Sequence, residues 1–139
     1  MKPFSIAVVL AVLLLGGVFL FFFPSPIVLL GGDRVEPTQV RAGDTISVWR
    51  NYRVRRDVHL TNTRAMTQGD CSHSCEVIDL RSGSRVLKRG DHIDVRRDHV
   101  IPLHTRPGKW TLGFTLSYAG IFGRVVTIEL QRLDIEVIP

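Results

Sequence analysis

Residues 110–118 read Trp110-Thr-Leu112-Gly-Phe114-Thr-Leu116-Ser-Tyr118, and this stretch decides the fold. Every even-numbered side chain in it is large and apolar, whereas every odd-numbered residue is small or polar. Because successive side chains of a strand point to opposite faces of a sheet, the pattern predicts a strand with one buried face and one wet face. Pro107 and Gly108, just before it, predict a tight turn into this strand.

Further strand candidates recur on both sides of this stretch, separated by Gly, Pro and Asp turn signals. Residues 35–48 contain a short Pro-bearing edge strand, a Gly-Asp turn and a second strand. In residues 124–138 the apolar side chains of the first half lie on the opposite strand face from those of the second half. This change of face predicts a bulge or sheet switch near Gln131 and Arg132. Other strands are expected at residues 76–80, 85–88, 93–95 and 99–103. No sustained helical period follows residue 33, so residues 33–139 are predicted to form one all-β domain, an antiparallel β-sandwich.

The Gly43-Asp44 turn, and the Pro-Gly turn that leads into the aromatic-started strand at Trp110, resemble those of immunoglobulin-like and fibronectin-type-III-like sandwiches. The resemblance covers most of residues 35–139 and implies an immunoglobulin-like antiparallel β-sandwich. The chain departs from true immunoglobulin domains because it lacks their paired Cys and central Trp at the expected separation. With the apolar amino terminus, residues 35–48 and 107–118 are also similar to small bacteriophage-encoded single-pass membrane proteins of unknown function, which implies no activity.

The amino-terminal segment is different in kind from the rest of the chain. Residues 4–23 follow Lys2, carry no charge and contain one polar side chain, Ser5. At about 1.5 Å per residue, a helix of this length matches a hydrocarbon core of about 30 Å. A cleavable signal peptide would have a shorter apolar core and a small-x-small cleavage site, which is missing here. We therefore expect residues 1–32 to form an uncleaved amino-terminal transmembrane helix, a signal anchor, with a short linker.

The orientation of this anchor follows from weak charge evidence and from the cysteines. Lys2 on one side is nearly balanced by Arg34 and Arg41 on the other. The two cysteines and the β-rich domain favour an oxidising compartment. The sequence thus predicts a cytoplasmic amino terminus and a carboxyl-terminal domain that is periplasmic or extracellular.

Residues 71–75, Cys71-Ser-His73-Ser-Cys75, gather several reactive groups. The simplest interpretation in an oxidising compartment is a Cys71–Cys75 disulfide that staples a loop between strands. The alternative is a zinc or Cu(I) site of two thiolates and His73. Its fourth ligand would be one of the other four histidines, His59, His92, His99 or His104. The spacing is not the common C-x-x-C, and no second Cys pair is present.

Enzymatic activity has no support in the sequence, because it contains no nucleophile elbow, no Gly-rich phosphate loop and no identifiable carboxylate pair. His92, Asp94, Arg96 and Asp98 alternate with Ile93 and Val95, which predicts a solvated strand face rather than an acid–base site. We therefore expect no enzyme, no cofactor and no small-molecule substrate.

The formal net charge is +5, and Arg50, Arg53, Arg55 and Arg56 lie in one short stretch. Arg85, Lys88, Arg89, Arg96 and Arg97 extend the predicted basic surface. This surface either pairs with nearby Asp residues or contacts anionic headgroups or surface polymers. Nucleic acid is not an expected partner, because the span separates the domain from it. Ile121 and Phe122, in a predicted loop over residues 120–123, need a partner or a membrane to cover them.

These features favour a non-enzymatic, membrane-anchored binding or structural module displayed outside the cytoplasmic membrane. Its expected partners are the lipid bilayer and a protein in or at the membrane. Its expected contacts are the basic stretch from Arg50 to Arg56 together with Ile121 and Phe122. One alternative is a periplasmic metal-binding protein that uses Cys71, His73 and Cys75. Another is an accessory protein of a phage or envelope complex.

Overall fold

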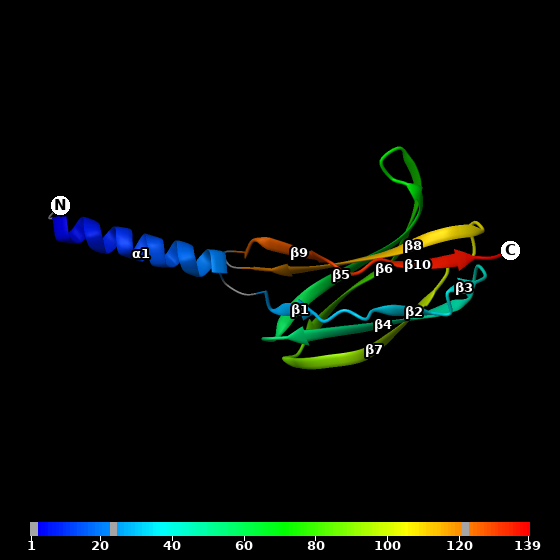
Figure 1. The fold of residues 1–139 in the computed structure, drawn as a ribbon, viewed down its shortest axis with the longest axis horizontal. Coiled ribbons are helices and arrows are strands. Elements are labelled where there is room, and N and C mark those ends of the chain that lie inside the picture. Colours follow the sequence, from blue (N-terminus) through cyan, green and yellow to red (C-terminus); the bar gives the residue numbers. More distant parts are fainter. Residues whose placement is uncertain (1–2, 23–24, 121–122) are drawn as a thin grey trace.

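The chain is mainly β, with two sheets and one amino-terminal helix. The computed structural model describes residues 3–22, 25–120 and 123–139. The helix is α1 (Pro3–Phe22), and the strands are β1 (Ile27–Leu29), β2 (Arg34–Glu36), β3 (Gln39–Val40), β4 (Thr45–Val54), β5 (Val58–Asp70), β6 (Ser74–Leu87), β7 (Gly90–Val100), β8 (Gly108–Ala119), β9 (Val125–Glu129) and β10 (Leu133–Val137). Figure 1 shows α1 projecting from one end of the β domain, opposite the carboxyl terminus.

The first sheet is built on β4. Strands β1 and β2 pair with successive halves of one edge of β4, and β7 pairs along its other edge, all antiparallel. Val54 therefore lies opposite Ile27 on one side and Gly90 on the other. We expected residues 27–29 to belong to the linker, but they form β1, and Ile27 is buried against the core.

The second sheet has the order β6, β5, β8, with β9 and β10 on the far edge of β8. Strand β9 pairs with the second half of β8 and β10 with its first half, so the pairing with β8 is interrupted and shifts register between Glu129 and Leu133. This confirms the sheet irregularity predicted near residues 131 and 132. Strand β3 adds to this sheet by running parallel to β10.

The core lies between the two sheets, and β8 dominates it as predicted. Trp110, Leu112, Phe114, Leu116 and Tyr118 are all buried, and none is more than 7% exposed. The indole N–H of Trp110 also keeps a partner, donating to the carbonyl oxygen of Arg106 at 2.8 Å. Burial of apolar side chains at about 25 cal/mol per Å² makes this interface the main stabilising contact of the domain.

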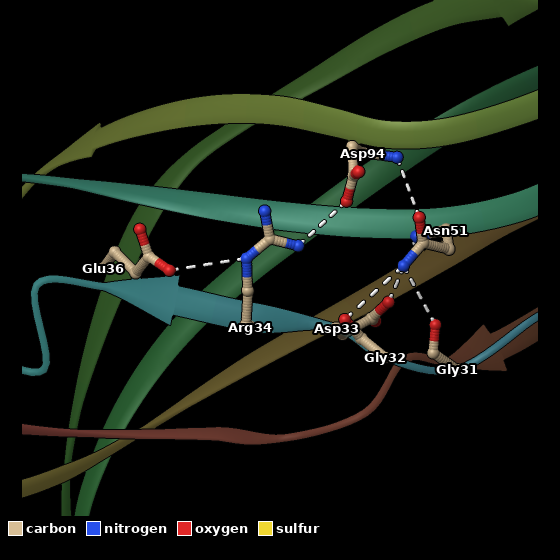
Figure 2. Close-up of polar contacts among 7 residues, drawn as sticks. All are labelled: Gly31, Gly32, Asp33, Arg34, Glu36, Asn51 and Asp94. Atoms are coloured by element: carbon tan, nitrogen blue, oxygen red, sulfur yellow. Dashed lines mark hydrogen bonds and ion pairs between the residues drawn. The ribbon is translucent and has the colours of Figure 1, made fainter.

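A bulge interrupts the pairing of β4 and β7 at Asn51. Ile93 and Asp94 together oppose Asn51, and Asp94 has a positive φ of 50°. The Asp94 N–H donates to the Asn51 side-chain oxygen at 2.8 Å. In Figure 2 the Asn51 amide also reaches back to the chain before β2, donating to the carbonyl oxygens of Gly31 at 3.1 Å and Gly32 at 3.4 Å. Asn51 thus ties the linker between β1 and β2 to the centre of the first sheet.

The same bulge changes which side chains of β7 face the core, so the predicted solvated face of this strand is partly wrong. Asp94, Arg96 and Asp98 are exposed as expected, but His92 is half-buried and stacks on Tyr52 with ring centroids 5.0 Å apart. Ile93, which we expected to be buried, is 59% exposed. An inserted residue reverses the side-chain alternation, and the sequence pattern alone does not reveal it.

The apolar amino-terminal segment is helical, as predicted. Its side chains over residues 5–19 are exposed. Within the ranges that the structure describes, no helix has the combination of length and apolar character needed to cross a membrane. The predicted helix is therefore confirmed, whereas the predicted membrane span is not supported by the described residues.

Candidate binding surfaces

The predicted disulfide is present at the tip of the β5–β6 hairpin. Cys71 and Cys75 are bonded to each other, with their Cα atoms 4.6 Å apart. Figure 1 shows this hairpin rising away from the two sheets. His73 lies exposed within the bridged loop, and its Nδ1 is 2.8 Å from the Ser72 hydroxyl. The tip is thus a covalently closed, exposed loop.

The metal alternative finds no support at this tip. The two sulfurs are bonded to each other and are not free as thiolates. His59 contacts the Ser84 hydroxyl at 2.9 Å, and His99 packs on Phe114, so these two proposed fourth ligands are engaged elsewhere. Within the described parts of the chain, no group of three or more His, Cys, Asp or Glu side chains could hold a metal ion.

The structure divides the predicted basic stretch between three environments. Arg50 points inward from β4, where it is 8% exposed and pairs with Asp33. Arg53 points outward and makes a two-pronged contact with Asp91, at 2.6 Å and 3.2 Å. Arg55 and Arg56 follow the end of β4 and are exposed in the turn to β5. Strand alternation causes this division, so the stretch is not one continuous patch.

Arg55 and Arg56 instead belong to a basic surface at the end of the domain beside α1, which we call the helix-proximal end. The Arg55 N–H donates to the carbonyl oxygen of Pro26 at 2.8 Å, soon after α1 ends. Gly90 lies opposite Val54, which brings the β6–β7 turn to the same end. The surface comprises the exposed residues Arg55, Arg56, Lys88, Arg89 and Arg124.

The loop between β8 and β9 also lies at the helix-proximal end. Ala119 pairs with Val125 at the end of β8, and the neighbouring Tyr118 hydroxyl is 3.5 Å from the Ser25 hydroxyl. Val125 is 68% exposed there. The predicted contact residues Ile121 and Phe122 lie outside the described residues, and they stay a prediction.

Carboxylates offset part of this positive charge. Asp57 accepts the Arg89 N–H at 2.8 Å and the Lys88 ammonium at 3.0 Å, and these hydrogen bonds lower the pKa of its carboxyl group. Asp91 pairs with Arg53, and that hydrogen bond lowers the pKa of Asp91 as well. The five cations of the helix-proximal end therefore exceed the two carboxylates of the same turns and present a net positive surface.

A second basic group lies between the sheets, and we call it the inter-sheet arginine cluster. It consists of Arg50 on β4, Arg64 on β5, Arg85 on β6, and Arg97 and His99 on β7, all lining one cavity. The cavity measures about 30 Å³. Arg64 shares the inward phase of the buried Leu60 and Met66, and two bulges keep β6 and β7 facing it.

The cluster contains more hydrogen-bond donors than acceptors. Nη2 of Arg50 and the Nε atoms of Arg64 and Arg85 are buried without a hydrogen-bond partner. Asp33 pairs with Arg50, but in the described part of the chain no ion pair joins Arg64, Arg85 or Arg97 to a carboxylate. Buried guanidinium groups without acceptors are costly, so the cavity is electrostatically unbalanced.

The pKa shifts of the cluster reflect burial and mutual repulsion. Burial lowers the pKa of Arg64, and the charges of Arg85 and Arg97 lower it further. Burial likewise lowers the pKa of Arg85, partly offset by Tyr52. His99 is 9% exposed, and burial together with Arg64 and Arg50 lowers its pKa to about 4. His99 is therefore neutral at pH 7 beside several fixed positive charges.

The sequence pattern did not predict this cluster. We assigned Arg85 and Arg97 to an outer basic surface, considered His99 as a possible metal ligand, and did not select Arg64. Strand alternation is the sequence signal that could have identified Arg64. Because Arg64 lies two positions from Met66 and four from Leu60, it shares their face of the strand.

Comparison with known proteins gives no family assignment. No protein-family model matches the chain, and no curated protein matches it significantly. Among solved structures, one similar protein is the alkylpurine DNA glycosylase AlkC from Pseudomonas fluorescens, bound to DNA containing an abasic site analog. It aligns with a TM-score of 0.49 and 15% sequence identity, and the alignment covers 84% of this chain and 31% of AlkC. Spo0M, a sporulation control protein from Bacillus subtilis, aligns with a TM-score of 0.42 and 13% identity, over 78% and 51%. The chain thus spans less than two thirds of either protein, and both similarities are distant.

Proposed function

We propose that this protein is a non-enzymatic binding module, anchored to a membrane by its apolar amino-terminal segment, residues 1–32, and resting on anionic headgroups through its helix-proximal end. The observation that carries this proposal is the gathering of five exposed cations, from three separate turns, beside an apolar helix. A basic surface next to a membrane is attracted to anionic lipid by about 1 kcal/mol per Lys or Arg.

The exposed apolar surface of α1 supports the anchor. Residues 5–19 contain no charged side chain, and Leu13, Leu14 and Leu15 are 66%, 68% and 70% exposed. A helix that is apolar on all sides requires a protein core or a lipid environment to cover it. The β domain leaves these side chains uncovered, so lipid is the environment we propose.

We further propose that the domain is an immunoglobulin-like sandwich with its carboxyl-terminal part outside the cytoplasm. The support for the fold is connectivity: β4 and β5, β6 and β7, and β7 and β8 are consecutive strands in different sheets, as Greek-key sandwiches require. The support for the location is the Cys71–Cys75 bridge, because disulfides persist in oxidising compartments. A protein partner in or at the membrane completes the proposal.

Extraction of membranes from expressing cells tests the anchor. The full chain is expected to stay in the pellet after alkaline carbonate washing, and its β domain is expected to be digested by protease added from the non-cytoplasmic side. A Leu13→Arg/Leu14→Arg variant should move to the soluble fraction, because two buried charges cost several kcal/mol in a bilayer. Leu13→Phe/Leu14→Phe is the matched control. Extraction of the unmodified chain by carbonate would contradict the anchor.

A further inference from the structure

The inter-sheet arginine cluster has no role in the proposed membrane contact. We propose that it is a binding site for a single oxyanion, a phosphate or carboxylate group held by Arg64, Arg85 and Arg97. The site lies along the open side of the sandwich, because β6 and β7 are edge strands of the two sheets and both contribute to the cavity wall. This inference goes beyond the proposed function and does not depend on the anchor.

Charge balance is the first argument. Four arginines line the cavity and Asp33 is the one carboxylate among its described lining residues, already paired with Arg50. Moving an unpaired ion out of water costs several kcal/mol, even after relaxation of the protein around it. An anion in the cavity removes this imbalance, whereas an apolar ligand would worsen it.

Hydrogen-bond geometry is the second argument. A guanidinium group carries five N–H donors in a planar fork that matches the oxygens of a carboxylate or phosphate. The buried Nε atoms of Arg64 and Arg85 lack acceptors, and they come from the neighbouring strands β5 and β6. Arg50, although 8% exposed, also leaves Nη2 without a partner. The three arginines line the cavity from both sheets, so unpartnered donors belong to side chains on opposite walls of it.

Cavity size limits the ligand. A cavity must offer about 10–15 Å³ to hold one water molecule, and this cavity offers about 30 Å³. This space suits one small anionic group and excludes a sugar ring or a nucleotide. Arg97 is exposed, whereas Arg64 and Arg85 are half-buried, so the cavity is reached from solvent past Arg97.

Calorimetric titration of the full chain in a neutral detergent tests the site with two probes, inorganic phosphate and acetate, against chloride at matched ionic strength. We expect saturable binding of phosphate, acetate or both, and about a tenfold or greater loss of affinity in Arg64→Gln, since one charged hydrogen-bond donor is removed. Arg41→Gln is the control, because it removes the same charge from an exposed position at the end of the domain far from α1. The affinity of this variant for the anion should equal that of the unmodified chain.

The relative responses of the probes identify the source of the ligand. Preference for phosphate indicates a phosphate group, and preference for acetate indicates a carboxylate. Absence of saturable binding of either probe, or equal loss in Arg64→Gln and Arg41→Gln, would overturn the proposal. If Arg64→Gln does not fold, the imidazole NMR signal of His99 replaces it as a readout. A bound anion should raise the pH at which this signal titrates, and an unchanged midpoint in saturating phosphate and acetate would overturn the proposal as well.

Discussion

Lowering the pH should destabilise the domain through His99, and the size of the effect follows from its surroundings. In the folded chain, burial and the charges of Arg64, Arg50 and Arg97 lower the pKa of His99 from 6.5 to about 4, against a smaller opposite effect of Asp98. In the unfolded chain the imidazole regains its ordinary pKa. Between these two values the unfolded chain binds more protons than the folded one, so the free energy of unfolding falls as the pH falls.

The magnitude is about 3 kcal/mol over the whole window, at about 1.4 kcal/mol per pH unit. Because the folded imidazole itself begins to titrate near its pKa, about 2 kcal/mol of this loss should have appeared at about pH 4.5. Carboxylates such as Asp57 and Asp98 have pKa values lowered by their hydrogen bonds, so their contributions are lost at still lower pH. The interval from about pH 7 to 4.5 therefore isolates the histidine.

Urea unfolding of the full chain in a neutral detergent, followed by the fluorescence of its two tryptophans, of which Trp110 is buried in the core, measures this loss. His99→Asn removes the titrating group and should remove about 2 kcal/mol of the pH dependence, while its own stability at neutral pH is lower. Parallel pH profiles for the unmodified chain and His99→Asn would refute the argument that His99 is neutral and surrounded by cations.

Three other substitutions test the core, the linker clamp and the hairpin tip, each by the same urea assay. Leu112→Ala should cost about 2–5 kcal/mol, because Leu112 is completely buried between the sheets; a loss below about 1 kcal/mol would contradict that packing. Asn51→Ala should cost about 1–3 kcal/mol by leaving the Asp94 N–H without its acceptor, and an unchanged free energy of unfolding would contradict this clamp. Cys71→Ser should cost about 2 kcal/mol or less, because the bridge closes a short loop, and it should leave the anion affinity unchanged. Reduced anion affinity in Cys71→Ser would contradict the separation of the tip from the arginine cluster.

Regular alternation was sufficient to predict the most buried part of the fold. The pattern of residues 110–118 identified β8 and its inward face, and the two apolar phases of residues 124–138 identified the break between β9 and β10. These features are local, because each depends on the side-chain period of one strand.

Bulges explain most of what the sequence did not predict. The bulge in β6 joins two expected short strands into one, and the bulge at Asp94 turns His92 inward and Ile93 outward. The arginine cluster depends on the same shifts and on the way four consecutive strands are divided between two sheets that face each other. A charged residue at an inward position is also usually read as a sign that the face is wet, because isolated buried charges are costly. The cluster violates that rule, as ligand sites commonly do.

The most direct test of the membrane contact is amide hydrogen exchange at the helix-proximal end. The full chain would be inserted in nanodiscs of phosphatidylcholine alone or of phosphatidylcholine with phosphatidylglycerol, and exchange would be followed at Arg55, Arg56, Lys88 and Arg89. We expect slower exchange at these turns in the anionic nanodiscs, and loss of the difference at high salt, because salt screens exposed charges. Equal exchange in both lipids at low salt would contradict the proposed contact between the basic end and anionic headgroups.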